Sequence, residues 1–306
     1  MCAPRGVPVK PAPFGYHRAS SVDDAVRLLA AYEGSARLLA GGQSLVPMMN
    51  MRLLRPDALV DLHGIRALGG VVADGETTRI GALVRHVELE HSPVIADRLG
   101  LLAGVVRHVG DRQVRNRGTI GGSLCQGDPT GEIPLACMVL GASVMVTGLE
   151  RTREIPVSEL YVDSYVTVLE PSEVLTEVVV PSAPAYSAFA EVCRRHNDFA
   201  VVSVAAVGDR GEDGTWTDVR VGLGGVAPTP VIATAAGAAL CGGSLSGDAI
   251  TVAAELALEV VDPPDDVRAS AEYRRHLVPV YVTRVLRALG AAGERGRVAG
   301  EQRRDR

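Results

Sequence analysis

The chain has 306 residues, of which 47% are hydrophobic and 22% charged, and its formal net charge is −5. This length and apolar content suit a multi-domain globular protein with a large buried core. The negative charge and the 4% aromatic content disfavour a nucleic-acid partner, which would need a basic face or stacking platforms. No apolar run reaches the roughly 18 to 20 residues that span a bilayer, and residues 1–16 lack the apolar core of a signal peptide. We therefore expect a cytoplasmic protein without a membrane span.

The first region of the chain, residues 1–62, is typical of a small α/β unit. Ser21, with an acidic residue three positions later, predicts a helix that ends near Gly34. A short strand over 37–40, a short helix that begins at Ser44, and a strand over 58–62 follow.

Two glycine pairs lie far apart and share one pattern, because each follows an apolar run and precedes a hydroxyl side chain. The first motif comprises Ala40, Gly41, Gly42, Gln43, Ser44 and Leu45, and the second comprises Thr119, Ile120, Gly121, Gly122 and Ser123. Paired glycines let the backbone approach a ligand closely, and consecutive N–H groups form a concave nest for anionic oxygens. One such turn is also compatible with a plain strand-to-helix turn. Two together indicate a diphosphate that is held from two sides.

The second region, residues 63–182, mixes strands and helices. The pattern predicts strands over 71–83, 142–147 and 174–180, and helical or turn-like segments over 97–109 and 132–140. Asp128 follows the second motif closely. A carboxylate there would bind ribose hydroxyls, or it would belong to an ordinary turn with Pro129.

The third region, residues 183–290, follows a linker candidate at 181–184. Its β-rich runs cover 187–195, 200–209 and 216–223, and its helical stretches cover 231–240, 248–260 and 269–289. Residues 291–306 are polar and Arg-rich, and we expect them to form a frayed or disordered tail.

Other chemical motifs are weak or missing. Residues 222–227 (GLGGVA) match the G-x-G-x-x-A dinucleotide fingerprint, but Pro228 and Pro230 follow where its helix should begin. A glycine-rich structural corner is therefore favoured there. The five cysteines include no C-x-x-C pair, and hydrolase motifs and histidine spacings typical of metal sites are absent from the sequence. We assign no catalytic residue and no metal ligand.

Residues 39–47 (LAGGQSLVP) and 115–123 (RNRGTIGGS) together resemble the FAD-binding medium subunit of the molybdenum hydroxylases. This family includes the carbon monoxide dehydrogenase medium subunit and the flavin domain of xanthine dehydrogenase. The resemblance runs from about residue 13 to 290 and includes residues 194–200 and 226–230. It implies an α+β fold: a two-part FAD-binding domain of the vanillyl-alcohol-oxidase (PCMH) type, then a C-terminal domain with a three-stranded antiparallel sheet and a helix bundle.

The resemblance also implies a non-covalent FAD site. Both glycine motifs would hold the pyrophosphate, and Glu132, with Asp128 nearby, would lie on the adenosine side. Leu175 matches a position close to the flavin. Phe199 would lie against the isoalloxazine ring, unless it is a core residue. Some members carry a cofactor-contacting lysine where this chain has Ala190.

The implied function is that of an oxidoreductase subunit for electron transfer. A large molybdopterin subunit would oxidise the substrate, and a small subunit with [2Fe–2S] clusters would relay electrons to the FAD of this chain. The assembly would be a dimer of heterotrimers, and NAD⁺, a quinone or oxygen would be the acceptor. Two alternatives stay open: a stand-alone FAD-dependent oxidase or reductase, and a scaffold that has lost FAD.

Overall fold

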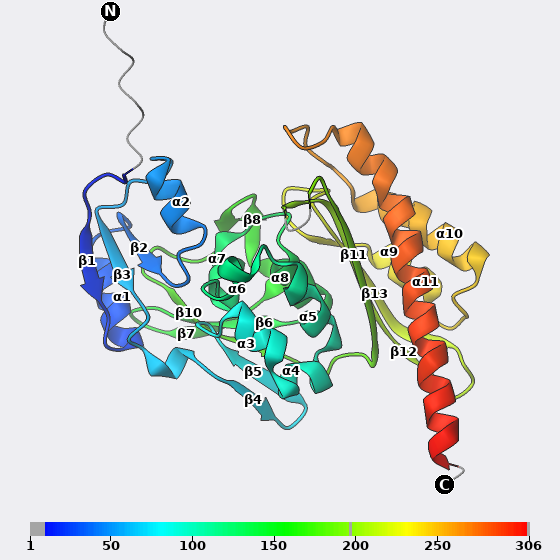
Figure 1. Cartoon of the computed structure of the whole chain (residues 1–306). Helices are drawn as coiled ribbons and strands as arrows, with labels where there is room; N and C mark the ends of the chain where they lie inside the picture. Colours follow the sequence, from blue (N-terminus) through cyan, green and yellow to red (C-terminus); the bar gives the residue numbers. More distant parts are fainter. Residues whose placement is uncertain (1–9, 196–197, 305–306) are drawn as a thin grey trace, which may run out of the picture.

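The computed structural model describes residues 10–195 and 198–304 (Figure 1). His196 and Asn197, which belong to the family-like segment 194–200, lie outside the described residues. Among the described residues, three larger sheets follow one another across the molecule in chain order, and a fourth sheet is a two-stranded hairpin.

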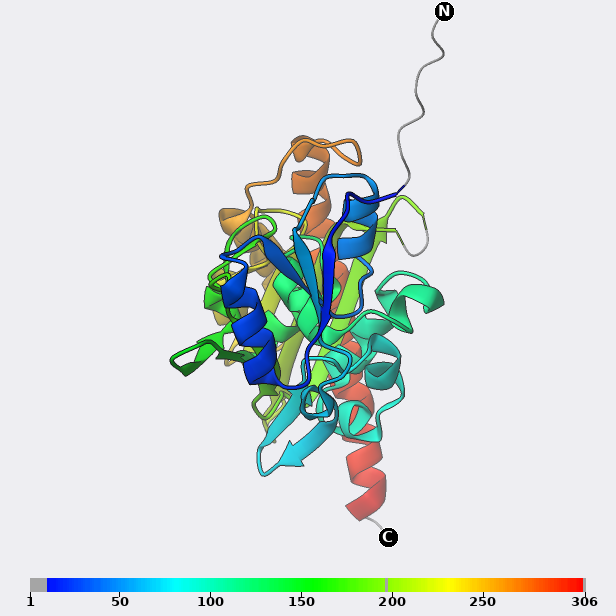
Figure 2. The same cartoon turned by 90° about the vertical axis from the view of Figure 1, so that its left-hand side faces the viewer.

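The N-terminal sheet has three parallel strands in the order β1-β3-β2. Their bounds are β1 (Gly15–Arg18), β2 (Ala36–Leu39) and β3 (Ala58–Asp61). Helix α1 (Val22–Ala31) packs its apolar side on this sheet (Figure 2), and the Ser21 hydroxyl caps it by accepting the Asp24 N–H at 3.1 Å. Helix α2 (Leu45–Asn50) follows β2. Because the strands are parallel, the turns that follow β2 and β3 meet at one edge, where Leu62 N donates to Leu39 O at 3.1 Å.

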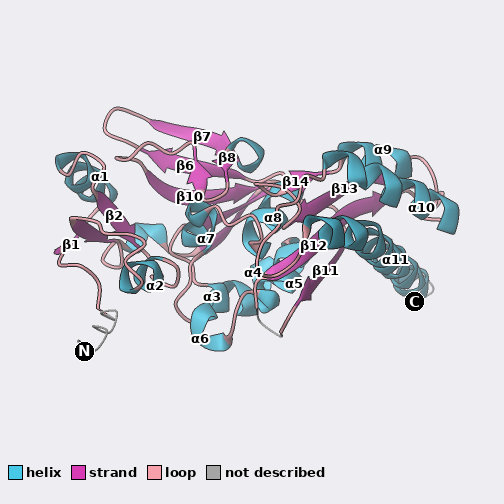
Figure 3. Cartoon of the chain, turned by 90° about the horizontal axis from the view of Figure 1, so that it is seen from above, coloured by secondary structure: helices cyan, strands magenta, loops and turns pink. Residues whose placement is uncertain are grey.

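The middle sheet has five antiparallel strands in the order β4-β5-β10-β6-β7. They are β4 (Val71–Asp74), β5 (Thr77–Gly81), β6 (Ser143–Thr147), β7 (Thr152–Pro156) and β10 (Val174–Val180). Between β5 and β6 the chain forms α3 (His86–His91), α4 (Pro93–Arg98), α5 (Gly100–Val105), α6 (Arg112–Arg115), α7 (Ile120–Gln126) and α8 (Glu132–Val139), which gather on one side of the sheet (Figure 3). The helical pattern predicted over 97–109 is divided, because the backbone breaks at Leu99 (φ −131°).

Short elements complete this region. The 3-10 turns are η1 (Arg66–Leu68), η2 (Val106–His108) and η3 (Val157–Glu159), and a small hairpin pairs β8 (Tyr161–Asp163) with β9 (Val166–Thr167). The hairpin tip joins two parts of the chain, since Tyr165 N donates to Gly127 O at 2.8 Å and the Ser164 hydroxyl donates to Pro228 O at 2.9 Å.

The C-terminal sheet is antiparallel, with β11 (Tyr186–Cys193), β12 (Ala200–Arg210), β13 (Trp216–Gly224) and β14 (Val231–Ile232). The three expected strands are present, and the two-residue β14 extends them. One face of the sheet contributes Ala205 and Val207 to the core of the middle region. The other face packs on α9 (Thr234–Leu240), α10 (Gly247–Leu256), η4 (Ala257–Val260) and α11 (Ala271–Arg304).

Two local expectations can be compared with the structure. The glycine-rich segment 222–227 ends antiparallel β13 and turns at Gly225 (φ +74°) without a following helix, so it is a structural corner. The expected tail differs, because α11 continues to Arg304. Its Ala, Glu and Arg residues favour helix, and no proline follows Pro279. Within the described ranges, no helix has the length and apolar character that crossing a bilayer requires.

Candidate functional site

The two glycine motifs are in contact with each other. A Cβ atom on Gly41 would overlap the carbonyl oxygen of Arg117 and lie 2.8 Å from the Cα of Gly118. A Cβ on Gly122 would lie 3.9 Å from the Cβ of Ala40. The turn before α2 therefore packs against the segment that leads into α7, and Gln126 Nε2 of α7 lies 3.8 Å from the sulfur of Met48 in α2. The absence of a side chain at Gly41 is what allows this approach.

The first motif presents a row of unused backbone donors. Among the described residues, the N–H groups of residues 41–45 have no hydrogen-bond acceptor. Gly42 adopts φ +73°, which reverses the chain and favours glycine. Gln43 and Ser44 are exposed, so this turn faces solvent. Five consecutive free amides at a solvent-facing turn form a nest that can bind an anionic oxygen.

The second motif is organised differently, because its amides already donate within the chain. Ile120 N donates to Val84 O at 3.0 Å, Gly121 N to Ala82 O at 3.0 Å, Gly122 N to the Thr119 hydroxyl at 3.1 Å, and Ser123 N to Thr119 O at 3.0 Å. The motif begins α7, and Thr119 is its cap. A Cβ on Gly121 would lie only 2.7 Å from the Cβ of Ala82. This glycine pair therefore serves close packing, and the second amide nest that the sequence suggested is not formed.

A buried histidine supports the second motif. His86 at the start of α3 is 2% exposed, and its Nε2 lies 3.0 Å from the Ser123 hydroxyl oxygen. Its backbone N–H donates to Gly118 O at 3.0 Å. Burial lowers the pKa of His86 to about 4, so its imidazole is neutral near pH 7. No spacing pattern in the sequence singles out this residue, and its contact with Ser123 is visible only in the fold.

The carboxylate of Asp128 is engaged within its own turn. Its Oδ1 accepts the Thr130 N–H at 2.9 Å and the Thr130 hydroxyl at 2.8 Å. Its Oδ2 accepts the Tyr165 hydroxyl at 3.3 Å. Asp128 thus holds the turn between α7 and α8 and fastens the β8–β9 hairpin. The turn alternative accounts for these contacts without a ligand.

Glu132, the first residue of α8, is half-buried. Burial raises the pKa of Glu132 to about 7, and the nearby carboxylates of Glu191 and Asp128 add to this rise, whereas His108 opposes it. Glu191 on β11 accepts from His108 Nδ1 at 3.2 Å and from the Cys193 thiol at 3.4 Å. Glu132 therefore faces a polar cluster of Glu191, His108 and Cys193 between the middle and C-terminal regions. This cluster was not predicted from the sequence.

The two remaining expected residues occupy different environments. Leu175 is 3% exposed in the core of the middle sheet, beside a bulge between Leu175 and Glu177. At this bulge Thr176 O accepts the Ala82 N–H at 3.0 Å, which links β10 to the segment that holds Gly121. Phe199 is 53% exposed, and the Arg268 guanidinium lies 4.5 Å from its ring centroid. Phe199 is therefore not a core residue.

A cavity of about 220 Å³ adjoins the second motif. Its lining includes Thr119, His63, Arg66, Arg85 and Glu88. His63 is fixed there, since its Nδ1 lies 2.6 Å from the buried carboxylate of Asp61. The cavity offers room and cationic groups next to the contact between the two motifs.

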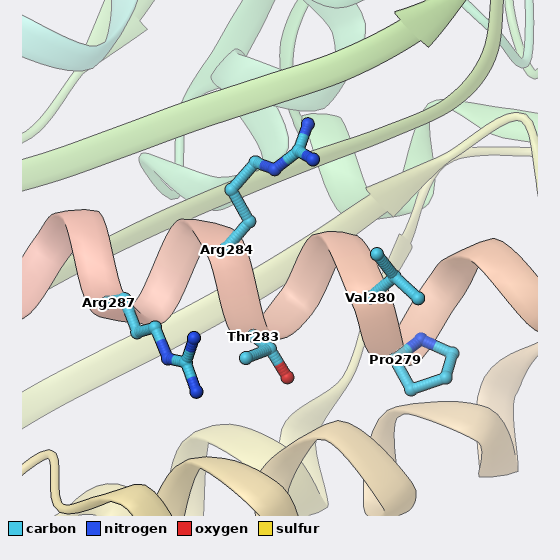
Figure 4. Close-up of a pocket in the computed structure, with 5 residues that line it drawn as sticks. All are labelled: Pro279, Val280, Thr283, Arg284 and Arg287. Carbon is cyan, nitrogen blue, oxygen red and sulfur yellow. The ribbon is translucent and has the colours of Figure 1, made fainter.

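A second hollow, of about 570 Å³, lies on α11 and is lined by Pro279, Val280, Thr283, Arg284 and Arg287 (Figure 4). In Figure 4, Arg284 points to one side of the helix, and Thr283 and Arg287 point to another. All five residues come from one helix, remote from the glycine motifs (Figure 1), so this hollow is not part of the site. In the described ranges, no group of three or more His, Cys, Asp or Glu residues is arranged to hold a metal ion.

Comparison with known proteins gives consistent results. The family described as "FAD binding domain in molybdopterin dehydrogenase" matches residues 12–183, and "CO dehydrogenase flavoprotein C-terminal domain" matches residues 187–289. The 6-hydroxypseudooxynicotine dehydrogenase complex subunit alpha of Paenarthrobacter nicotinovorans is 38% identical over 91% of this chain and 95% of its own length. The carbon monoxide dehydrogenase medium chain of Hydrogenophaga pseudoflava is 35% identical over 92% and 98%. A solved carbon monoxide dehydrogenase from the same organism, lacking the Mo-pyranopterin moiety, superposes with a TM-score of 0.89 at 37% identity, covering 92% of this chain and 99% of that one.

Proposed function

Because the chain belongs to the FAD-binding medium subunits of the molybdenum hydroxylase family, we propose that it passes electrons from the [2Fe–2S] clusters of a small partner subunit to an external acceptor. Membership of this family makes it an FAD-binding oxidoreductase subunit. The single observation that carries the proposal for the site is the contact between the two glycine motifs, one of which presents five free amides.

The residues fit a dinucleotide whose diphosphate lies at residues 40–45. The free amides point to negatively charged oxygens, and a Cβ on Gly41 would disrupt the contact that positions them. The cavity lined by His63 and Arg85 gives space for a further part of the ligand. When bound, FAD supplies the redox chemistry of the subunit. This chain's own residues bind it, orient it and shape its surroundings.

The other residues that are expected to contact FAD are each supported by a different observation. Phe199 presents an exposed ring that can pack on the isoalloxazine, and Arg268 holds it from one face. Leu175 would act through backbone position, because its side chain is in the core. Glu132 and Asp128 are proposed for the nucleoside side, with Asp128 also holding its own turn. We propose the same division into regions 1–62, 63–182 and 183–290, which the three separate sheets support.

Relatives of the chain are named as a subunit of a dehydrogenase complex and as a carbon monoxide dehydrogenase medium chain, which supports a place for this chain in a multi-subunit complex. We propose that its partners are a small [2Fe–2S] subunit and a large molybdopterin subunit, in a dimer of heterotrimers. The described part of the chain has no cluster of cysteines that could hold an iron–sulfur centre, which supports an external electron relay.

Co-expression with the neighbouring reading frames tests this function. The purified chain should release FAD, and not FMN, into the supernatant after acid precipitation. Dye-linked substrate oxidation should appear only in the co-purified complex. Vigorous substrate turnover by the isolated flavin-loaded chain would contradict the subunit assignment and favour a stand-alone flavoenzyme, and a colourless chain that does not take up added FAD would contradict the cofactor site.

A further inference from the structure

In the second motif, the side chain of Ser123 is the polar group that remains available to a ligand. The four amides of residues 120–123 are consumed by Val84, Ala82 and Thr119, as described above. The Thr119 hydroxyl is also engaged, as the acceptor for Gly122 N. The Ser123 hydroxyl contacts only one group among the described residues, the Nε2 of His86 at 3.0 Å. Whether this hydroxyl can serve a ligand therefore depends on the direction of that hydrogen bond.

The surroundings of His86 decide the direction. Its Nδ1 is buried and has no hydrogen-bond partner within the described residues. A proton on Nδ1 would leave a buried N–H without an acceptor, which is costlier than an unfilled lone pair. A neutral imidazole carries one proton, so that proton belongs on Nε2. Nε2–H then donates to the Ser123 oxygen, and the hydroxyl proton of Ser123 is left free to point elsewhere.

His86 also lies next to the contact between the two motifs. A Cβ on Gly118 would lie 2.8 Å from the His86 ring carbon Cε1, and a Cβ on Gly41 would lie 2.8 Å from the Gly118 Cα. One residue, Gly118, thus separates the imidazole from the first motif. The free amides of residues 41–45 belong to the first motif, on one side of the contact at Gly118. The Ser123 hydroxyl belongs to the second motif, on the other side.

We propose that His86 is a positioning residue, which donates from Nε2 to Ser123 so that the Ser123 hydroxyl donates to an anionic oxygen of the dinucleotide's diphosphate. This inference rests on the proposed FAD site. The first motif then contributes backbone donors and the second contributes one oriented hydroxyl. His86 does not touch the ligand, and its effect on affinity passes through Ser123.

Measurement of FAD affinity in a set of variants of the full chain tests the proposal. Ser123→Ala should weaken FAD binding about tenfold, which is the loss of one hydrogen bond to a charged group. His86→Asn should weaken FAD binding to a similar degree, because the amide nitrogen of the asparagine takes the position of Nδ1 and does not reach Ser123. His86→Gln, whose amide N–H can take the place of Nε2–H, should retain most of the affinity. The double variant His86→Asn/Ser123→Ala should bind FAD as Ser123→Ala does.

Three comparisons keep the result interpretable. Riboflavin, which lacks phosphates, should bind the wild type and Ser123→Ala equally. Ser203→Ala, which removes a buried hydroxyl without a partner in the C-terminal sheet, should leave FAD affinity unchanged. Equal affinity of Ser123→Ala and the wild type, additive losses in the double variant, or His86→Gln as weak as His86→Asn would each overturn the positioning role. Failure of the wild type to bind FAD would instead overturn the proposed function.

If His86→Asn does not fold, the pair Ser123→Ala and His86→Gln decides the matter. The proposal expects a tenfold loss in the first and near wild-type affinity in the second. A loss of comparable size in both, with unchanged thermal stability, would contradict it.

Discussion

The two glycine motifs have similar sequences and different physical roles. In the first, a left-handed glycine turns the chain so that five successive amides are free. In the second, the same residue types let α7 approach Ala82 and Val84, and the amides donate to Ala82, Val84 and Thr119 within the chain. The difference arises from what lies beside each motif, because the second has a strand-like partner segment and the first ends at solvent. A glycine pair thus permits close approach, and its neighbours determine whether a ligand or the protein itself makes that approach.

The strongest test of this comparison is Gly121→Val. Its side chain would meet the Cβ of Ala82 at 2.7 Å and the carbonyl oxygen of Ala82 at 2.8 Å. We expect a loss of about 3 kcal/mol or more in the free energy of unfolding, measured with urea. Gly104→Val in α5, where nothing lies within 4 Å of the added Cβ, is the control and should cost much less. A stable, FAD-free Gly121→Val protein would show that this glycine serves the ligand directly.

Gly42→Ala should affect the ligand more than the fold. Its Cβ would meet only the side chains of Leu39 and Val46, at 3.3 and 3.4 Å, so the cost is mainly the left-handed backbone, about 1 kcal/mol. Relaxation of this turn would misalign the free amides, and we expect FAD affinity to fall at least tenfold in a fluorescence titration. Gly75→Ala, also left-handed (φ +56°) but in the β4–β5 turn, provides the matched control. Equal FAD affinities in the two variants would refute the amide nest.

The environment of Glu132, which follows the second motif, can be tested through the pH dependence of the free energy of unfolding. The folded-state pKa of Glu132 is about 7, raised from 4.5, so the folded chain holds this proton more tightly than the unfolded chain. Stability should therefore fall as pH rises from about 4.5 to 7, by at most about 1.4 kcal/mol per pH unit, and then level off. Glu132→Gln should remove this fall in urea unfolding curves. The exposed Glu76→Gln should leave it unchanged. The same slope in Glu132→Gln and the wild type would exclude Glu132 as its source.

The smallest effect is expected for Gly122→Ala. The added Cβ would lie 2.8 Å from the Thr119 hydroxyl oxygen and would weaken that helix cap by about 1 kcal/mol. FAD affinity should stay within about threefold of the wild type. A tenfold loss without a loss of stability would mean that the backbone of the second motif contacts the ligand as directly as that of the first.

The sequence predicted most helices and strands because these elements depend on local signals. Ser21 caps α1 as its spacing indicated, and the apolar runs became the expected strands. It could not show that the amides of Ile120 and Gly121 are used internally, since their acceptors, Val84 and Ala82, are distant in the chain. His86 was equally hidden, because only tertiary contact brings it to Ser123. The extent of α11 was misjudged from its polarity, which does not prevent a helix.

The bulge of β10 has a consequence for how the protein is assembled. Thr176 O binds Ala82 N, and Ala82 O binds Gly121 N, so a relay of main-chain bonds runs from the central strand of the middle sheet to the second motif. A one-residue slip of β10 against β5 or β6 would move this relay and separate the two motifs. Yellow colour in a purified preparation would then report on strand alignment, and flavin retention could serve as a quality check on refolded or redesigned versions of the chain.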